Sequence, residues 1–200
     1  MGALLVMFAL TINLVTEESP SADLSVRGND PDLYMVNAAI RQFDETGQLQ
    51  HRIEAERFTH YPLTDLTTMQ QPNMSLASGS DTSAWQINSQ EGRILPGTQY
   101  REEVIELWDN VLATRDTGSG DFINVSTENL TVYPSREYAE TDRRVTIDNQ
   151  ASRTTAAGMK AYLDSGRFMF FSNSAERVVS IFLPDQQTNL PDETSDGLLE

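Results

Sequence analysis

Apolar and polar residues alternate with a period of two along most of this chain, and this pattern restricts the fold more than any other feature. Val36, Ala38 and Ile40 alternate with their neighbours in this way, and similar short runs follow. A period of two places one face of each strand on a core. Turn-forming groups such as residues 117–120 separate the runs, and no helical period persists over three turns. The sequence therefore predicts an all-β domain over residues 33–183.

Three segments within this domain resemble one another: residues 53–62, 87–96 and 125–134. Each begins with a β-branched residue, has a small residue two positions later and then Glu or Gln, and carries a large apolar residue before a final Pro. The segments begin 34 and 38 residues apart. A single unit of this kind cannot bury its apolar face alone, so the pattern predicts a solenoid-like stack of strand-turn-strand units. Coincidence among short β segments is the alternative interpretation.

The composition excludes several classes of function. The formal net charge of −16 argues against a nucleic-acid partner, because affinity for nucleic acid comes largely from basic groups. The chain has no cysteine, so disulfides and cysteine-ligated metals are excluded. His51 and His60 are the only histidines, and their spacing matches no metal or catalytic motif. In a regular strand these two side chains point to opposite faces. We expect no metal and no cofactor.

A catalytic role has little support in the sequence. Glu54 and Glu56 share one face of a predicted strand, and paired carboxylates can hydrolyse glycosides. Their neighbours Arg52 and Arg57 instead indicate a solvated face of mixed charge. The chain has no phosphate-binding loop and no Gly-x-Ser-x-Gly nucleophile motif. We expect no catalytic residues and a protein that is not an enzyme.

The two ends of the chain differ from the β domain. Residues 1–15 are almost wholly apolar and lack the basic residues of a secretory signal, which favours an N-terminal transmembrane anchor. An atypical signal peptide and a buried globular helix are the alternatives. Residues 16–32 are rich in Ser, Pro, Asp and Glu and predict a flexible linker, and residues 184–200 predict a disordered tail.

The inward-facing side chains of such a stack are candidates for lining an apolar trough. A trough of this kind suits acyl chains, because burying one CH₂ contributes about 0.8 kcal/mol. The alternative is that the same residues pack against each other as a closed core, since both arrangements give the same alternation. The candidates are Val36, Ala38, Ile40, Ile53, Phe58, Met69, Met74, Leu76, Trp85, Ile87, Ile105, Leu107, Ile123, Val125, Leu130, Val132, Phe168 and Phe170.

A series of short motifs, in this order and spacing, resembles the LptC family of lipopolysaccharide export proteins. The likeness spans roughly residues 29–179, and a hydrophobic N-terminus stands where that family has one. The matching stretches are residues 29–32, 43–49, 53–56 with 60–61, 71–72, 85–89, 105–111, 127–130 and 158–160. One departure is Asn149, where the family tends to have Gly. Asn tolerates a positive φ better than most residues, so a turn there can survive the change.

The resemblance implies a single-pass inner-membrane protein whose periplasmic domain has two apposed antiparallel sheets in an open jelly-roll. It implies that the domain accepts lipopolysaccharide from the inner-membrane ABC transporter of the Lpt system at its N-terminal edge. It then passes the lipid to the periplasmic bridge protein LptA at its C-terminal edge. The lipid-contacting positions of the family correspond to Ala38, Met69 and Phe168.

Two expectations about the ligand remain open at this point. Because the chain is strongly acidic, we expect the acyl chains to occupy the trough while the anionic headgroup stays at its rim or in solvent. The rival to a lipid carrier is a structural β adaptor that joins two partners and binds no lipid.

Overall fold

The computed structural model describes residues 29–77, 83–118 and 121–183, and these residues form a single antiparallel sheet of fourteen strands. One short 3₁₀ turn, η1 (Pro134–Arg136), interrupts it. The strands are β1 (Leu33–Phe43), β2 (Leu49–Tyr61), β3 (Leu66–Gln70), β4 (Asn73–Leu76), β5 (Trp85–Asn88), β6 (Glu91–Leu95), β7 (Val104–Gly118), β8 (Asp121–Tyr133), β9 (Tyr138–Thr141), β10 (Val145–Asn149), β11 (Ser152–Ala156), β12 (Gly158–Tyr162), β13 (Arg167–Phe171) and β14 (Val179–Phe182).

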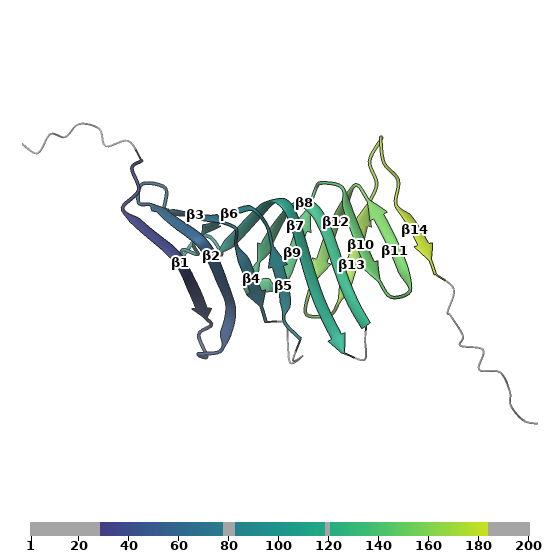
Figure 1. The fold of residues 1–200 in the computed structure, drawn as a ribbon, viewed down its shortest axis with the longest axis horizontal. Helices are drawn as coiled ribbons and strands as arrows, with labels where there is room; N and C mark the ends of the chain where they lie inside the picture. Colours follow the sequence, from purple (N-terminus) through teal and green to yellow (C-terminus); the bar gives the residue numbers. More distant parts are fainter. Residues whose placement is uncertain (1–28, 78–82, 119–120, 184–200) are drawn as a thin grey trace, which may run out of the picture.

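The sheet is folded along a line into two layers. Layer A consists of β4, β5, β10, β11 and β14, and layer B consists of β3, β6, β9, β12 and β13. The longer strands β1, β2, β7 and β8 cross the line and belong to both layers. For example, residues 51–54 of β2 pair with β4, whereas residues 57–61 pair with β3. Among the strands that make up one layer, each pairs with the ones before and after it in chain order, while the chain itself alternates between the two layers (Figure 1).

The long strands turn from one layer to the other by breaking their own alternation. In β2 the consecutive residues Glu56 and Arg57 are both exposed, so inward positions change from odd to even numbers. In β7 the break is a register shift at Asp109 and Asn110, whose φ values are 63° and 59°. Asp and Asn adopt positive φ more readily than other non-glycine residues, which suits them to this place. The shift keeps apolar side chains inside on both layers.

Breaks of the alternation in β1 and β2 correct two expectations from the sequence. Val36 does not line the interior but is 63% exposed, because Asn37 adopts a φ of 49° and interrupts the alternation of β1. His51 and His60 do not point to opposite faces. His51 lies on the inner face of layer A. His60 pairs with Thr67, and Thr67 pairs in turn with the buried Ile94, so His60 lies on the inner side of layer B.

The three similar segments occupy equivalent places in the sheet. Residues 53–62 and 125–134 follow β2 and β8 from layer A into layer B, and residues 87–96 do so through β5 and β6. Each final Pro stands just after the end of a layer B strand. Proline has no backbone N–H to donate to a ladder, which explains this position. The repeat therefore marks the passes of the chain from layer A to layer B.

The turn after β10 shows how Asn149 is accommodated. Its side-chain Oδ1 accepts hydrogen bonds from the backbone N–H groups of Ala151 at 2.9 Å and Ser152 at 2.7 Å. Asn149 is not among the residues with positive φ. The turn is thus stabilised by the side chain of Asn149 acting as a backbone mimic rather than by a left-handed conformation.

No helix in the described part of the chain is both long and apolar enough to cross a membrane. The proposed anchor at residues 1–15 and the tail at residues 184–200 lie outside the described residues, as does most of the linker.

Candidate functional site

The candidate site is the interior between layers A and B, where the cross-strand register aligns inward side chains into continuous rows. In layer A one row runs in register from Ile40 on β1 to Ile147 on β10. In layer B a second row runs from Ile94 on β6 to Phe168 on the edge strand β13. Both rows consist of apolar residues, so a continuous apolar strip lines each layer along the long axis.

Apart from Val36, every candidate lining residue faces this interior. Twelve of the eighteen candidates are buried in the core: Ile53, Phe58, Met69, Met74, Leu76, Trp85, Ile87, Ile105, Leu107, Val125, Leu130 and Val132. The remaining five, which are partly buried and packed against that core, are Ala38, Ile40, Ile123, Phe168 and Phe170. The structure therefore brings the set together in one place, and lipid contact at these positions stays a prediction.

Sequence reasoning missed a second group of interior residues. These are Met35, Ala55, Ile94, Val111, Ala113, Ala139, Ala156, Met159, Ala161 and Leu163. Several are small residues that seldom stand out in an alternation pattern. The alternation of Met159, Ala161 and Leu163 and the shift of alternation after Asp109 are the signals that could have found them.

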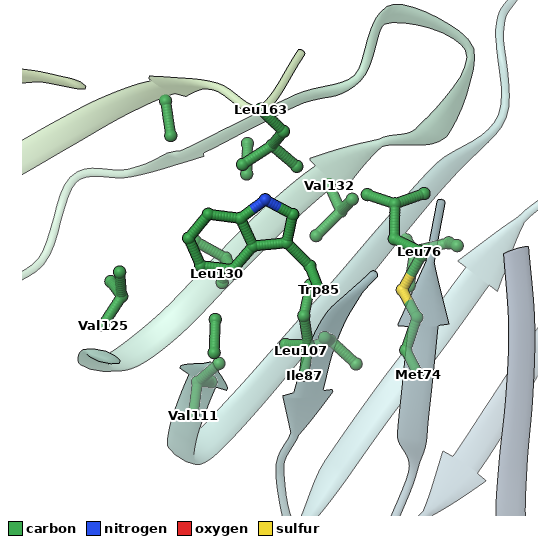
Figure 2. Close-up of a cluster of buried hydrophobic side chains, with 14 of the residues drawn as sticks. Met74, Leu76, Trp85, Ile87, Leu107, Val111, Val125, Leu130, Val132 and Leu163 are labelled. Carbon is green, nitrogen blue, oxygen red and sulfur yellow. The ribbon is translucent and has the colours of Figure 1, made fainter. Parts of the chain in front are cut away.

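Among residues 29–77, 83–118 and 121–183 the side chains close the interior, which is not an empty trough. The space left between Trp85, Leu130 and Phe168 is a cavity of about 10 Å³. This is at the lower limit for a single water molecule and far too small for an acyl chain. Figure 2 shows how the neighbouring leucine, valine and methionine side chains fill the space around Trp85. A lipid can enter only if the two layers move apart.

The layers meet at a mouth, which we define as the side opposite the fold line, where strand ends of layer A face strand ends of layer B. His51 Nε2 lies 3.4 Å from Glu103 Oε1 across the mouth. Farther along, Arg115 Nη1 donates a hydrogen bond of 3.4 Å to the carbonyl oxygen of Leu163. Within the described ranges no strand pairing crosses the mouth. Its closure therefore rests on side chains, which separate more easily than a backbone ladder.

Burial controls the charge at one of these contacts. His51 is 1% exposed, and burial lowers its pKa to about 4. Burial also raises the pKa of Glu103. At neutral pH His51 is therefore uncharged, and its contact with Glu103 is a weak polar contact rather than an ion pair.

Within the part of the chain that the structure describes, the two ends of the sheet have no further strand paired to them. β1 forms one end of both layers, and β13 and β14 form the other, at opposite ends of the long axis (Figure 1). Both edges carry exposed apolar side chains, including Tyr34 and Phe43 on β1 and Ile181 and Phe182 on β14. Long, apolar edge strands are ready to pair with another chain. The start of β1 is held in place by Asp32, whose carboxylate lies 2.6 Å from His60 Nδ1 and raises the pKa of that histidine.

The carboxylates considered for glycoside hydrolysis lie outside the interior. Glu54 faces outward and pairs with Arg52, and Glu56 is exposed at the fold line. Neither lines the interior cavity between Trp85, Leu130 and Phe168. No group of three or more His, Asp or Glu side chains suited to holding a metal ion occurs in the described portion of the chain.

These features define an all-β protein in which one folded antiparallel sheet encloses an apolar interior and ends in two exposed edges. The chain belongs to the LptC family, because the family model described as "Lipopolysaccharide-assembly, LptC-related" matches residues 2–176. The family and the antiparallel all-β fold expected from the sequence are both confirmed. As a member of this family, the chain is a component of lipopolysaccharide transport.

A solved structure with the same fold is LptH from Pseudomonas aeruginosa, which is described as the LptA-homologous periplasmic component of the conserved lipopolysaccharide transport device. The TM-score is 0.54 at 6% sequence identity, and the match covers 67% of this chain and 95% of that chain. At this identity the likeness establishes the fold alone. A search of curated protein sequences gives no match.

Proposed function

We propose that this protein carries lipopolysaccharide across the periplasm, with the acyl chains held between layers A and B. The observation that carries the proposal is the pair of apolar rows that line the interior along its long axis. Each methylene moved from water into such an interior contributes about 0.8 kcal/mol, so several acyl chains bind without any specific polar contact. Against this gain stand the contacts that close the mouth.

The two edges give the transfer a direction. We propose that β1 extends a sheet of the inner-membrane ABC transporter of the Lpt system and that β14 extends a sheet of the bridge protein LptA. Edge-to-edge pairing uses the unpaired backbone groups of both partners and joins their interiors end to end. In this arrangement residues 1–15 anchor the chain in the inner membrane and the β domain lies in the periplasm. The energy for transport comes from ATP hydrolysed by the transporter.

Site-specific photocrosslinking tests the carrier directly. A photoreactive amino acid is placed at Met69 or Phe168, which face the interior, and at Gln86, which is exposed on the outer side of layer A, as the control. We expect lipopolysaccharide to label the two interior positions and to leave Gln86 unlabelled. Labelling of neither interior position, or equal labelling of all three, contradicts the proposal.

A second candidate is a structural adaptor that joins two partners by its edges and binds no lipid. The specific observation in its favour is the closed interior, with a cavity of only about 10 Å³. Native mass spectrometry of the full chain separates the two candidates. A population with bound lipopolysaccharide, released on activation in the gas phase, supports the carrier, and a mass equal to that of the bare chain after incubation with lipid supports the adaptor.

A further inference from the structure

A buried donor beside the mouth lacks an acceptor. Trp85 is 1% exposed, and its indole Nε1–H has no hydrogen-bond partner among the residues that the structure describes. Figure 2 shows this nitrogen on the side of the ring that faces Leu163, which belongs to the opposite layer. A buried donor without an acceptor is costly to the fold, so an acceptor that reaches it is bound favourably.

A buried cation lies next to this indole. Arg115 is 7% exposed, and it is the one Arg or Lys side chain in the buried class within the described ranges. The carbon at the centre of its guanidinium lies 5.8 Å from the centroid of the Trp85 ring, which is a cation–π distance. Its Nη1 donates to the Leu163 carbonyl across the mouth. Trp85, Arg115 and Leu163 are thus adjacent, at a point where the layers must separate.

Opening the mouth changes what these donors meet. Separation of the layers takes the Leu163 carbonyl away from Arg115 Nη1, and the guanidinium stays charged because it cannot lose its proton. The indole N–H becomes accessible at the same time. The methylene groups of an acyl chain accept no hydrogen bonds. An anionic oxygen at the head of the lipid, just above its acyl chains, can accept from both donors while the chains enter the interior.

We propose that Trp85 and Arg115 form a binding site at the mouth for a phosphate group of the carried glycolipid. This inference rests on the proposed carrier function and specifies where the headgroup is held. Guanidinium groups bind phosphate through paired hydrogen bonds, and such charge-assisted bonds are stronger than neutral ones. The net charge of −16 does not oppose a local site of this kind, since exposed charges farther away than about 8 Å are largely screened at physiological ionic strength.

The indole N–H signals report on this site without any mutation. The chain contains two tryptophans, Trp85 and Trp108, so a ¹⁵N-labelled full chain gives two indole signals, and Trp108 serves as the internal control. The first probe is a hexaacylated glucosamine disaccharide with two phosphates, and the second is the same compound with both phosphates removed. Each is delivered in a maltoside detergent, which contains no phosphate. We expect the Trp85 N–H signal to move downfield with the phosphorylated probe and the Trp108 signal to stay in place.

Variants measure the contribution of each donor. Arg115→Met should weaken binding of the phosphorylated probe by about tenfold to hundredfold, as expected for the loss of a charged hydrogen bond. Trp85→Phe keeps a ring and removes the N–H, and should weaken binding by about threefold to tenfold. Arg115→Lys should fall between wild type and Arg115→Met, because Lys keeps the charge without the planar fork. Arg57→Met removes an exposed cation at the fold line and should change nothing. Melting curves establish that each variant is folded.

The outcomes separate this inference from the carrier proposal. Preference for the phosphorylated probe, lost in the Arg115 and Trp85 variants, supports the phosphate site. Equal binding of both probes, with no effect of these variants and no movement of the Trp85 signal, overturns the phosphate site and leaves the carrier intact. Binding of neither probe overturns the carrier itself.

Discussion

Acidification should weaken the fold through His51 more than through any other histidine. The unfolded chain binds a proton at His51 with the ordinary pKa of 6.5, whereas burial lowers the pKa in the folded state to about 4. Between these values the unfolded state binds more protons, so stability falls as the pH falls. Linkage then predicts a loss of about 2 kcal/mol in the free energy of unfolding between pH 7 and pH 5 from this one group. Above pH 6.5 the contribution is fully present.

The assay is urea-induced unfolding at pH 7 and pH 5, compared between wild type and His51→Gln. Carboxylates that do not contact His51 titrate alike in both proteins and cancel in the difference, so the wild type should lose about 2 kcal/mol more than the variant. His60→Gln is a matched control of opposite sign. Asp32 raises the pKa of His60, so that histidine stabilises the fold at low pH and loses this effect as the pH rises. An equal pH dependence in wild type and His51→Gln refutes the reasoning.

Three further predictions concern the interior and the edge. Ile105→Asp puts a charge at a position that is 0% exposed, and should lower the free energy of unfolding by at least about 3 kcal/mol and abolish lipid binding. The control, Gln86→Asp on the outer face, should change neither. Urea unfolding and a lipid-binding assay measure the two effects. Gly92→Ala adds a Cβ that would lie 2.8 Å from Met69 Cε, and should cost about 1–3 kcal/mol in the same unfolding assay unless that methyl group shifts freely. Ile181→Lys alters an exposed edge position, so the free energy of unfolding should stay within about 0.5 kcal/mol of wild type. The affinity for LptA, measured by calorimetry, should fall at least about tenfold. Unchanged affinity would exclude β14 as the docking edge.

Most of the interior could be read from the sequence because strand alternation is a local property. Residues two apart share a face whatever the rest of the chain does, so Met74 and Leu76 were assigned to one face correctly. The Pro that ends each similar segment also marked the passes of the chain between layers. Within each layer the strands pair in the order in which they occur along the chain, although strands of the other layer intervene between some partners, such as β3 and β6.

The failures of the sequence prediction lie where local alternation breaks. Asn37 turns β1 across the fold line, so Val36 faces solvent while Met35 packs against the core. Arg115 was not considered for the interior because a charged residue in an alternating run is ordinarily placed outside. In the structure the Trp85 ring and the Leu163 carbonyl lie beside its guanidinium.

The sequence by itself determined that this chain is all-β, which residues alternate toward a core, and which family it resembles. These features depend on short-range patterns and on motifs that can be read along the chain. Only the tertiary structure decided that the two layers close on each other at the mouth and that His51, Trp85 and Arg115 lie along that closure. The physical reason is that the mouth brings together residues distant in sequence, such as His51 and Glu103, and their meeting depends on the bend at the fold line, which no local pattern encodes.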